Sequence, residues 1–155
     1  MGDLYRIMGI DHGEKRIGIA LSDPFRNFAS PNCIIEQTTD AEVFAQIQAI
    51  IQSEQVKKIV IGLPTGTDGG IGMQGQIVLH WARAFADTLA LPIVFWDESY
   101  SSTDVKAMQS RTKKKKNRRR YIDDLAAAAI LQEYLQAGEF SDEPGQPLET
   151  YRNID

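Results

Sequence analysis

The sequence predicts an α/β fold built on one mixed, five-stranded sheet, with antiparallel strands at one side and parallel central strands flanked by helices. Two observations indicate this class. The chain starts with short apolar runs separated by turn residues, a pattern typical of antiparallel strands. After residue 40, apolar runs of strand length alternate with segments of helical periodicity, as expected for parallel strands covered by helices.

Three predicted strands form the antiparallel part. Residues 5–11 and 16–22 are apolar runs joined by the turn sequence His-Gly-Glu-Lys, which predicts a hairpin with Gly13 in its turn. Residues 32–36 follow two prolines and give the third strand. The apolar run over 5–11 ends in Asp11, a carboxylate at the inner end of a strand that otherwise resembles core.

The remainder of the chain alternates between predicted helices and strands. Asp40 is expected to cap the first helix, and Gly138 is suited to end the last one. The predicted elements are a helix over 40–55, a strand over 58–64, a glycine-rich loop over 62–75, a helix over 74–89, a strand over 91–98, a short helix over 101–110 and a helix over 121–138. We expect one domain over 1–138 and a loosely ordered tail over 139–155.

Composition restricts where the protein works. Cys33 is the only cysteine, so no internal disulfide can form, which suits a reducing cytoplasm. The N-terminal residues lack the features of a signal peptide, and the longest apolar run, over 125–131, is too short to cross a bilayer. These features predict a cytoplasmic protein with no membrane partner.

Positive charge is concentrated in one segment. Residues 111–120 hold eight of the seventeen Lys and Arg residues and no acid. The rest of the chain has nine basic against twenty-one acidic residues, a net charge of −12, although the whole chain carries only −4. An acidic body with one cationic segment favours a local site for a polyanion, and the competing interpretation is a solvated, disordered loop.

Acidic residues stand at three places where apolar ones would be expected. Asp11 ends the first strand, Glu98 follows Asp97 at the end of the last strand, and Asp123 and Asp124 open an alanine-rich helix. Because ligands gather beyond the carboxyl ends of parallel strands, we expect Asp11 and Glu98 to converge there. Clustered carboxylates need a cation, and oxygen ligands without His or Cys favour Mg²⁺ or Mn²⁺. Two such ions can support phosphodiester hydrolysis.

Each acid also has a purely structural interpretation. Asp11 could cap the hairpin, and Glu98 could pair with Lys15 or Arg16. Asp123 or Asp124 could be an acid favoured at a helix N-terminus, which is the preferred interpretation of Asp124. Helical spacing does not choose between the two, because both align with apolar positions. His12 and His80 lack metal-ligand spacing, and the glycine-rich loop lacks the Lys-Ser/Thr ending of a triphosphate-binding motif.

Four motifs together resemble one known family. They are GIDHGEKRIGIALSD, IVIGLPTGTDGG, DESYSSTDV and IDDLAAAAILQEYL, in this order and spacing over residues 5–137. This pattern resembles the YqgF family, bacterial proteins with a ribonuclease-H-like fold. The family is described both as Holliday junction resolvases and as nucleases that mature the 5′ end of precursor 16S ribosomal RNA.

The resemblance implies roles for individual residues. The family's three catalytic, metal-binding acids fall on Asp11, Glu98 and Asp123, with Asp124 as a close competitor of Asp123. Its Lys-Arg pair, which would meet substrate phosphate or hold the acids, falls on Lys15 and Arg16. The basic run would add the substrate-binding residues Lys113, Lys114, Lys115, Lys116, Arg118, Arg119 and Arg120. The family's usual Arg after the catalytic Glu is Ser99 in this chain.

The sequence therefore predicts a Mg²⁺- or Mn²⁺-dependent hydrolase of phosphodiester bonds, monomeric or homodimeric. Its expected substrate is structured RNA, most specifically precursor 16S ribosomal RNA, with ribosomal precursor particles as partners. One alternative keeps the chemistry and acts on four-way DNA junctions, which requires paired sites in a dimer. The other is a non-catalytic factor that binds nucleic acid or the ribosome, for which Ser99 is the direct support.

Overall fold

A single sheet of six strands forms the centre of the molecule, in the order β3-β2-β1-β4-β5-β6. The computed structural model describes residues 4–64, 71–97, 115–138 and 145–148, and within the last long helix it describes side chains from 125 onward. The elements are β1 (Arg6–His12), β2 (Arg16–Ser22), β3 (Ala29–Glu36), α1 (Asp40–Ser53), β4 (Val56–Leu63), α2 (Met73–Ala86), β5 (Ile93–Asp97), α4 (Lys115–Ala137) and β6 (Gln146–Pro147).

The directions of the strands confirm the predicted mixed sheet. β2 pairs antiparallel with β1 and with β3, whereas β4 runs parallel to β1 and to β5. Every strand predicted from the sequence is present, with bounds that match or shift by up to three residues.

The sheet has one strand more than the five predicted. Gln146 and Pro147 form β6, which pairs antiparallel with Phe95 and Val94 of β5. Gln146 and Pro147 are too few residues to show apolar alternation, and one of them is a proline. The sequence therefore gives no strand signal there. Residues 146 and 147 are thus part of the sheet, although the sequence predicts a loose tail over 139–155. Of that tail the structure describes residues 145–148.

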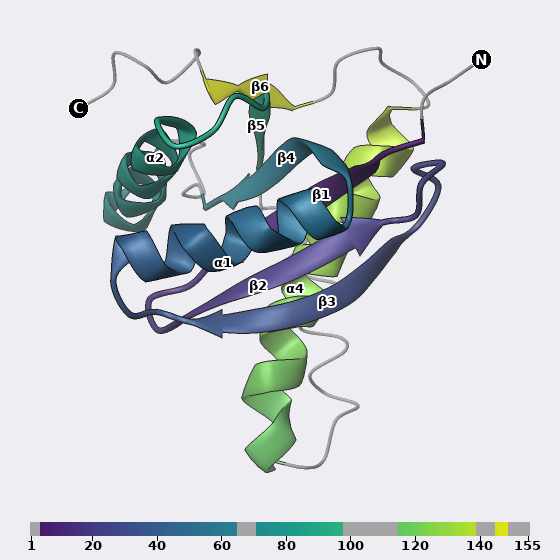
Figure 1. Cartoon of the computed structure of the whole chain (residues 1–155). Helices are drawn as coiled ribbons and strands as arrows, with labels where there is room; N and C mark the ends of the chain where they lie inside the picture. The colour runs from purple at the N-terminus through teal and green to yellow at the C-terminus, as the bar shows by residue number, and fades with distance from the viewer. Residues whose placement is uncertain (1–3, 65–70, 98–114, 139–144, 149–155) are drawn as a thin grey trace.

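Helices cover both faces of the sheet. In Figure 1, α1 lies in front of the sheet and α4 behind it, while α2 packs at one side of α1. The core under α1 and α2 contains large side chains, including Phe85 and Phe95, which are fully buried. The core under α4 contains smaller ones, including Ala20 and Ala127. Alternate residues of each strand belong to these two cores, as expected for a sheet covered on both faces.

Two helix starts differ from those predicted. Thr39, not Asp40, caps α1, because its Oγ1 accepts a hydrogen bond from the Glu42 amide at 3.2 Å. α4 begins at Lys115 instead of residue 121, since Lys and Arg are good helix formers. It ends at Ala137, as predicted for a helix followed by Gly138.

The short helix predicted over 101–110 lies outside the described residues. Among the described helices, none combines the length and apolar character needed to span a membrane.

Candidate active site

The carboxyl ends of three parallel strands meet at one edge of the sheet. β1 and β5 both run parallel to β4, which lies between them. Asp11 is the penultimate residue of β1 and Asp97 is the last residue of β5, so both acids stand at this edge. Glu98 directly follows Asp97 in the chain and lies outside the described residues. We call this end of the sheet the acid edge.

Glycines flank Asp11 on both neighbouring strands. Gly18 of β2 is its register partner, and Gly62 of β4 stands level with it because Ile10 pairs with Ile61. A side chain at either position would project beside the Asp11 carboxylate. The neighbouring strands therefore place no side chain beside Asp11 at these two positions, and both glycines are buried.

Alternation of the strand directs Asp11 toward α4. Ile10 and Met8 belong to the core under α1 and α2, whereas Ile7 belongs to the core under α4, which puts Gly9 and Asp11 on the α4 face. α4 approaches β1 closely at Gly9. A Cβ atom at that position would lie 2.8 Å from Leu131 Cβ and 2.9 Å from the Ala127 carbonyl oxygen. Only glycine at this position allows such a close approach.

The direction of α4 carries its first half toward the acid edge. Ala127 packs at Gly9 in the middle of β1, and Tyr134 lies near the start of β4, where its ring centroid is 5.2 Å from Lys58 Nζ. The helix therefore runs opposite to β1. Asp123 precedes Ala127 by four residues, or about 6 Å along the helix. Asp11 follows Gly9 by two residues, or about 6.6 Å along the strand.

The two steps are nearly equal, so the backbone of α4 at Asp123 and Asp124 stands level with Asp11. The side chains of these two residues lie outside the described part of the structure. Ala127 and Leu131 are fully buried, and Ala128 and Ile130 are almost so. Because all four positions face the core, burial does not distinguish Asp123 from Asp124 as the third acid.

Arg16 is already paired on β2. Its Nε lies 3.3 Å from Glu36 Oε1 on β3, its register partner, and both side chains are partly exposed. Arg16 shares the α4 face with Gly18 and thus with Asp11. Lys15 is exposed in the β1–β2 turn, which the hydrogen bond from the Gly13 amide to the Arg16 carbonyl closes at 2.9 Å. The predicted cation pair is therefore near the acid edge, with Arg16 engaged by Glu36.

Most of the predicted basic run is helical. Lys115, Lys116 and residues 118–120 lie in the first two turns of α4, and Lys113 and Lys114 lie outside the described residues. In Figure 1 this part of α4 projects past the sheet. The run is thus joined, through one continuous helix, to the segment that carries Asp123 and Asp124.

The acid edge suits a hard divalent cation. Asp11 and Glu98 offer only carboxylate oxygens, which Mg²⁺ and Mn²⁺ prefer. No group of three or more His, Cys, Asp or Glu residues that could hold a metal occurs among the described residues. Glu98 and the Asp123 side chain, which would complete such a group, are not among them.

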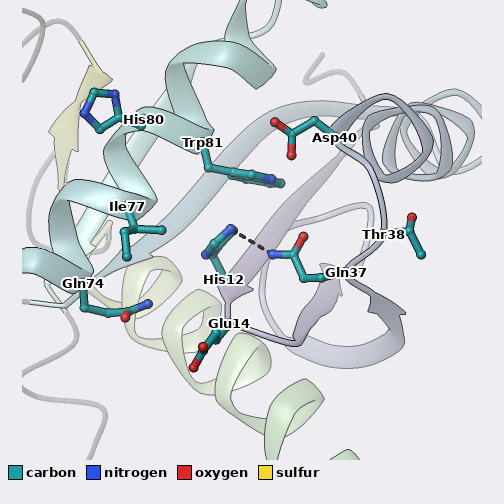
Figure 2. Close-up of a pocket in the computed structure, with 9 residues that line it drawn as sticks. All are labelled: His12, Glu14, Gln37, Thr38, Asp40, Gln74, Ile77, His80 and Trp81. Carbon is teal, nitrogen blue, oxygen red and sulfur yellow. Dashed lines mark hydrogen bonds between the residues drawn. The ribbon is translucent and has the colours of Figure 1, made fainter.

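A hollow lies next to the acid edge, on the face of the sheet that α1 and α2 cover. It encloses about 610 Å³ and is lined by residues of β1, the β3–α1 segment and α2. Figure 2 shows the His12 ring beneath Trp81 and directed toward the Gln37 amide. The His12 and Trp81 ring centroids are 4.8 Å apart. The residue after Asp11 is therefore held in place by packing and by hydrogen bonding.

Gln37 links His12 to the hairpin turn. Gln37 Nε2 donates to the Gly13 carbonyl at 3.1 Å and lies 3.0 Å from His12 Nε2. A neutral ring with its proton on Nδ1 lets Nε2 accept from the amide, and Nδ1 is buried with no hydrogen-bond partner among the described residues. Burial lowers the pKa of His12 below its ordinary value, and the Asp40 carboxylate partly opposes this effect.

Sequence reasoning missed the contacts that support the site. It assigned no role to His12 or Gln37, and it placed Trp81 only among the apolar positions of a helix. It also missed the hydrogen bond from Trp96 Nε1 to Glu133 Oε2, 3.1 Å long, which ties β5 to α4. The available signal in the sequence was the set of glycines around Asp11. A glycine inside a strand often marks a place where another backbone or a ligand approaches the strand closely.

Comparison with known proteins agrees with this architecture. A protein of Syntrophomonas wolfei named "Putative pre-16S rRNA nuclease" is 39% identical over 86% of this chain and 95% of its own. A Dehalococcoides mccartyi protein of the same name is 40% identical over 79% of this chain and 92% of its own.

Two solved structures share the fold at low sequence identity. The structure of Thermus thermophilus RuvC with a Holliday junction substrate has a TM-score of 0.58 at 12% identity, covering 92% of this chain and 99% of that one. The fowlpox virus resolvase with Holliday junction DNA has a TM-score of 0.52 at 10% identity, covering 85% and 97%. These likenesses show a ribonuclease-H-like fold. Residues 5–137 match the family described as "RuvX: Holliday junction resolvase", also called YqgF, and the chain belongs to that family.

Proposed function

We propose that the protein is a metal-dependent nuclease that hydrolyses phosphodiester bonds at the acid edge. One observation carries the proposal: Asp11 ends a central parallel strand between Gly18 and Gly62, on the face that α4 covers. An acid at the carboxyl end of a central parallel strand, near two further acidic positions, is suited to hold a cation and a phosphate.

Asp11, Glu98 and Asp123 would hold one or two Mg²⁺ or Mn²⁺ ions. Bound there, the metal would supply charge stabilisation and an activated water for attack on phosphorus. Asp124 competes with Asp123 for the third position, since both stand level with Asp11 on α4. Ser99 in place of the family's usual Arg removes one cation from this region, and Arg16 or the basic run would then have to meet the phosphate.

The chain's own residues bind and orient the nucleic acid. The basic run, from Lys113 to Arg120, would contact the phosphate backbone, which gives salt-dependent affinity and little sequence selectivity. Lys15 is exposed beside Asp11 in the hairpin turn and is placed to meet a phosphate near the cleaved bond. Water adds to phosphorus as the 3′ oxygen leaves, so the products are a 5′ phosphate and a 3′ hydroxyl.

Precursor 16S ribosomal RNA is the proposed substrate, either free or in ribosomal precursor particles. The names of the bacterial relatives, which are 33–40% identical to this chain, support this substrate. A four-way DNA junction is the second candidate, supported by the description of the family. That reaction would need a homodimer, because resolving a junction takes two symmetric cuts.

A parallel cleavage assay tests these proposals. Purified wild type, Asp11→Asn and Asp97→Asn are each given precursor 16S RNA and a synthetic four-way junction, with Mn²⁺. Asp97→Asn is the matched control, because Asp97 lies at the same edge but alternates with Phe95 onto the α1–α2 face. We expect Asp11→Asn to cleave at least about 100-fold more slowly, and the control to cleave like wild type.

The outcomes separate the candidate functions. Cleavage of the RNA alone supports a ribosomal RNA nuclease, and cleavage of the junction alone supports a resolvase. Undiminished cleavage by Asp11→Asn would rule out the proposed site. Binding of either nucleic acid without cleavage by wild type would leave a non-catalytic factor.

A further inference from the structure

The β2–β3 turn presents two phenylalanines to solvent. Phe25 is 68% exposed and Phe28 is 69% exposed. The turn that carries them is held by Asp23, whose carboxylate accepts hydrogen bonds from the backbone amides of Phe25 at 3.1 Å, Asn27 at 2.7 Å and Phe28 at 2.7 Å. Three such bonds to one carboxylate fix the backbone, so the two rings extend from a defined platform.

Arg26 and α4 hold the turn against the body of the protein. Arg26 adopts a positive φ of 62°, and its guanidinium lies over the Tyr5 ring, 3.9 Å from the centroid. It donates hydrogen bonds to the carbonyls of Pro24 at 2.9 Å and Tyr5 at 3.2 Å. Gln132 of α4 accepts a hydrogen bond from the Ala29 amide at 2.8 Å. The turn is thus attached to the segment before β1 and to α4.

A hollow of about 360 Å³ adjoins the turn. The described residues that line it include two cations and no acid; they are Tyr5, Ile7, Phe25, Arg26, Asn27, Lys58, Tyr134, Leu135, Gln136 and Gly138. Each cation stands over a tyrosine ring, Arg26 over Tyr5 and Lys58 over Tyr134. Lys58 forms no ion pair within the part of the chain that the structure describes. The described lining of the hollow thus carries positive charge, and the acid of the adjoining turn is Asp23, whose carboxylate is engaged by the amides of the turn.

This combination matches the chemistry of single-stranded nucleic acid. Exposed aromatic rings stack on bases, and adjacent cations meet the phosphates between them. Arginine and lysine held over aromatic rings keep their charge at the surface. A single exposed apolar residue needs no explanation, but two phenylalanines on one fixed turn beside two cations indicate a binding surface.

We infer that Phe25, Phe28, Arg26 and Lys58 form a second contact for a single-stranded segment of the substrate, away from the acid edge. The inference rests on the proposed function for the identity of that substrate. The turn follows β2, which runs antiparallel to β1, and Ser22 Oγ accepts a hydrogen bond from the Ile7 amide at 2.9 Å. The turn therefore lies beside the amino end of β1, at the edge opposite Asp11.

The length of β1 sets the separation between the two contacts. Seven residues at about 3.3 Å each give roughly 20 Å between this surface and the acid edge. A substrate that meets both sites must therefore span roughly 20 Å between the bases on the phenylalanines and the cleaved bond.

A binding assay without divalent metal tests the surface independently of cleavage. The probe is a fluorescently labelled 12-nucleotide single-stranded RNA in EDTA, titrated with the full chain. One variant is the double substitution Phe25→Ser with Phe28→Ser, and another is Lys58→Gln. Lys57→Gln is the matched control for charge, because Lys57 is an exposed neighbour of Lys58 in the chain and is not among the described residues that line the hollow. Met73→Ser, at a residue 83% exposed on α2, is the control for the phenylalanines.

We expect the double variant to bind the RNA about tenfold more weakly, with the melting temperature unchanged. Lys58→Gln should lower the slope of log affinity against log salt by about 0.7, and Lys57→Gln should leave it unchanged. Ultraviolet cross-linking of wild type should label the peptide that holds residues 25–28. Wild-type affinity and salt slope in both test variants, without that cross-link, would overturn the inference and indicate a protein partner instead. Cleavage by Asp11→Asn would overturn only the proposed function.

Discussion

The two faces of the sheet are packed with side chains of different size. Under α1 and α2, the rings of Phe44, Trp81 and Phe85 form a cluster with centroids 5.2–5.6 Å apart. Under α4, Gly9, Ala20 and Ala127 let the helix backbone approach the strands closely, and larger residues such as Leu131 and Tyr134 complete a smaller core. The large-residue face supplies most of the buried apolar surface, and the small-residue face holds α4 against Asp11.

Under the proposed function, this difference should separate stability from catalysis. A cavity under α1 and α2 removes buried contacts but leaves the relation between β1 and α4 intact. A group inserted under α4 displaces the helix that would carry the proposed third acid. Substitutions on the two faces should therefore affect the free energy of unfolding and the activity in different proportions.

The largest expected effect is on the large-residue face. Phe85→Ala should lower the free energy of unfolding by about 3–5 kcal/mol, because Phe85 is fully buried and contacts two other rings. Urea denaturation measures this loss, and cleavage at low temperature should persist where the variant is folded. Phe28→Ala, at a ring 69% exposed, is the control and should change stability little. Equal destabilisation by the two variants would contradict the assigned core.

An intermediate effect is expected on the small-residue face. Gly9→Ala should lower the free energy of unfolding by about 1–3 kcal/mol, because the new methyl group would stand 2.8 Å from Leu131 Cβ and 2.9 Å from a backbone oxygen. Its cleavage rate should fall further than that of Phe85→Ala, measured where both are fully folded. Gly72→Ala is the control, since no atom lies within 4 Å of a Cβ there. A Gly9→Ala variant with normal cleavage would show that α4 does not position the site.

The smallest effect concerns the β2–β3 turn, outside both cores. Burial alone would raise the pKa of Asp23, but its hydrogen bonds from three backbone amides lower it below the ordinary value near 3.8. The carboxylate thus favours the folded state above about pH 3.8, and this contribution is lost as the pH falls through the folded pKa. Urea midpoints at several pH values should show wild type losing its small advantage over Asp23→Asn in that window. A constant difference at all pH values would argue against this role.

Much of the fold follows from the sequence because its patterns are local. The period of the apolar runs gave the strands and helices, and β-branched runs marked the central strands. β6 has no such pattern and is ordered through its pairing with β5. Residue type does not identify Thr39 as the cap of α1, because Asp40 beside it is an equally good capping residue.

The sequence indicates where the candidate acids stand along the elements but not which residues surround them, and their role in a site stays a prediction. Asp11 could be placed at the carboxyl end of a parallel strand from order alone. The ion pair of Arg16 with Glu36 depends on the register between β2 and β3, which the sequence does not specify. The bond between Gln37 and His12 joins residues 25 positions apart for the same reason. Contacts that depend on register or on helix placement required the structure.

Binding of Mn²⁺ tests the central claim most directly, namely that Asp11 and the acid of α4 hold a divalent metal together. Electron paramagnetic resonance can follow free Mn²⁺ as it is titrated with wild type, Asp11→Asn, Gly9→Ala and Phe85→Ala. We predict that Asp11→Asn weakens binding at least about tenfold, that Gly9→Ala weakens it measurably, and that folded Phe85→Ala binds like wild type. Mn²⁺ affinity that is the same in wild type and Asp11→Asn would contradict the account.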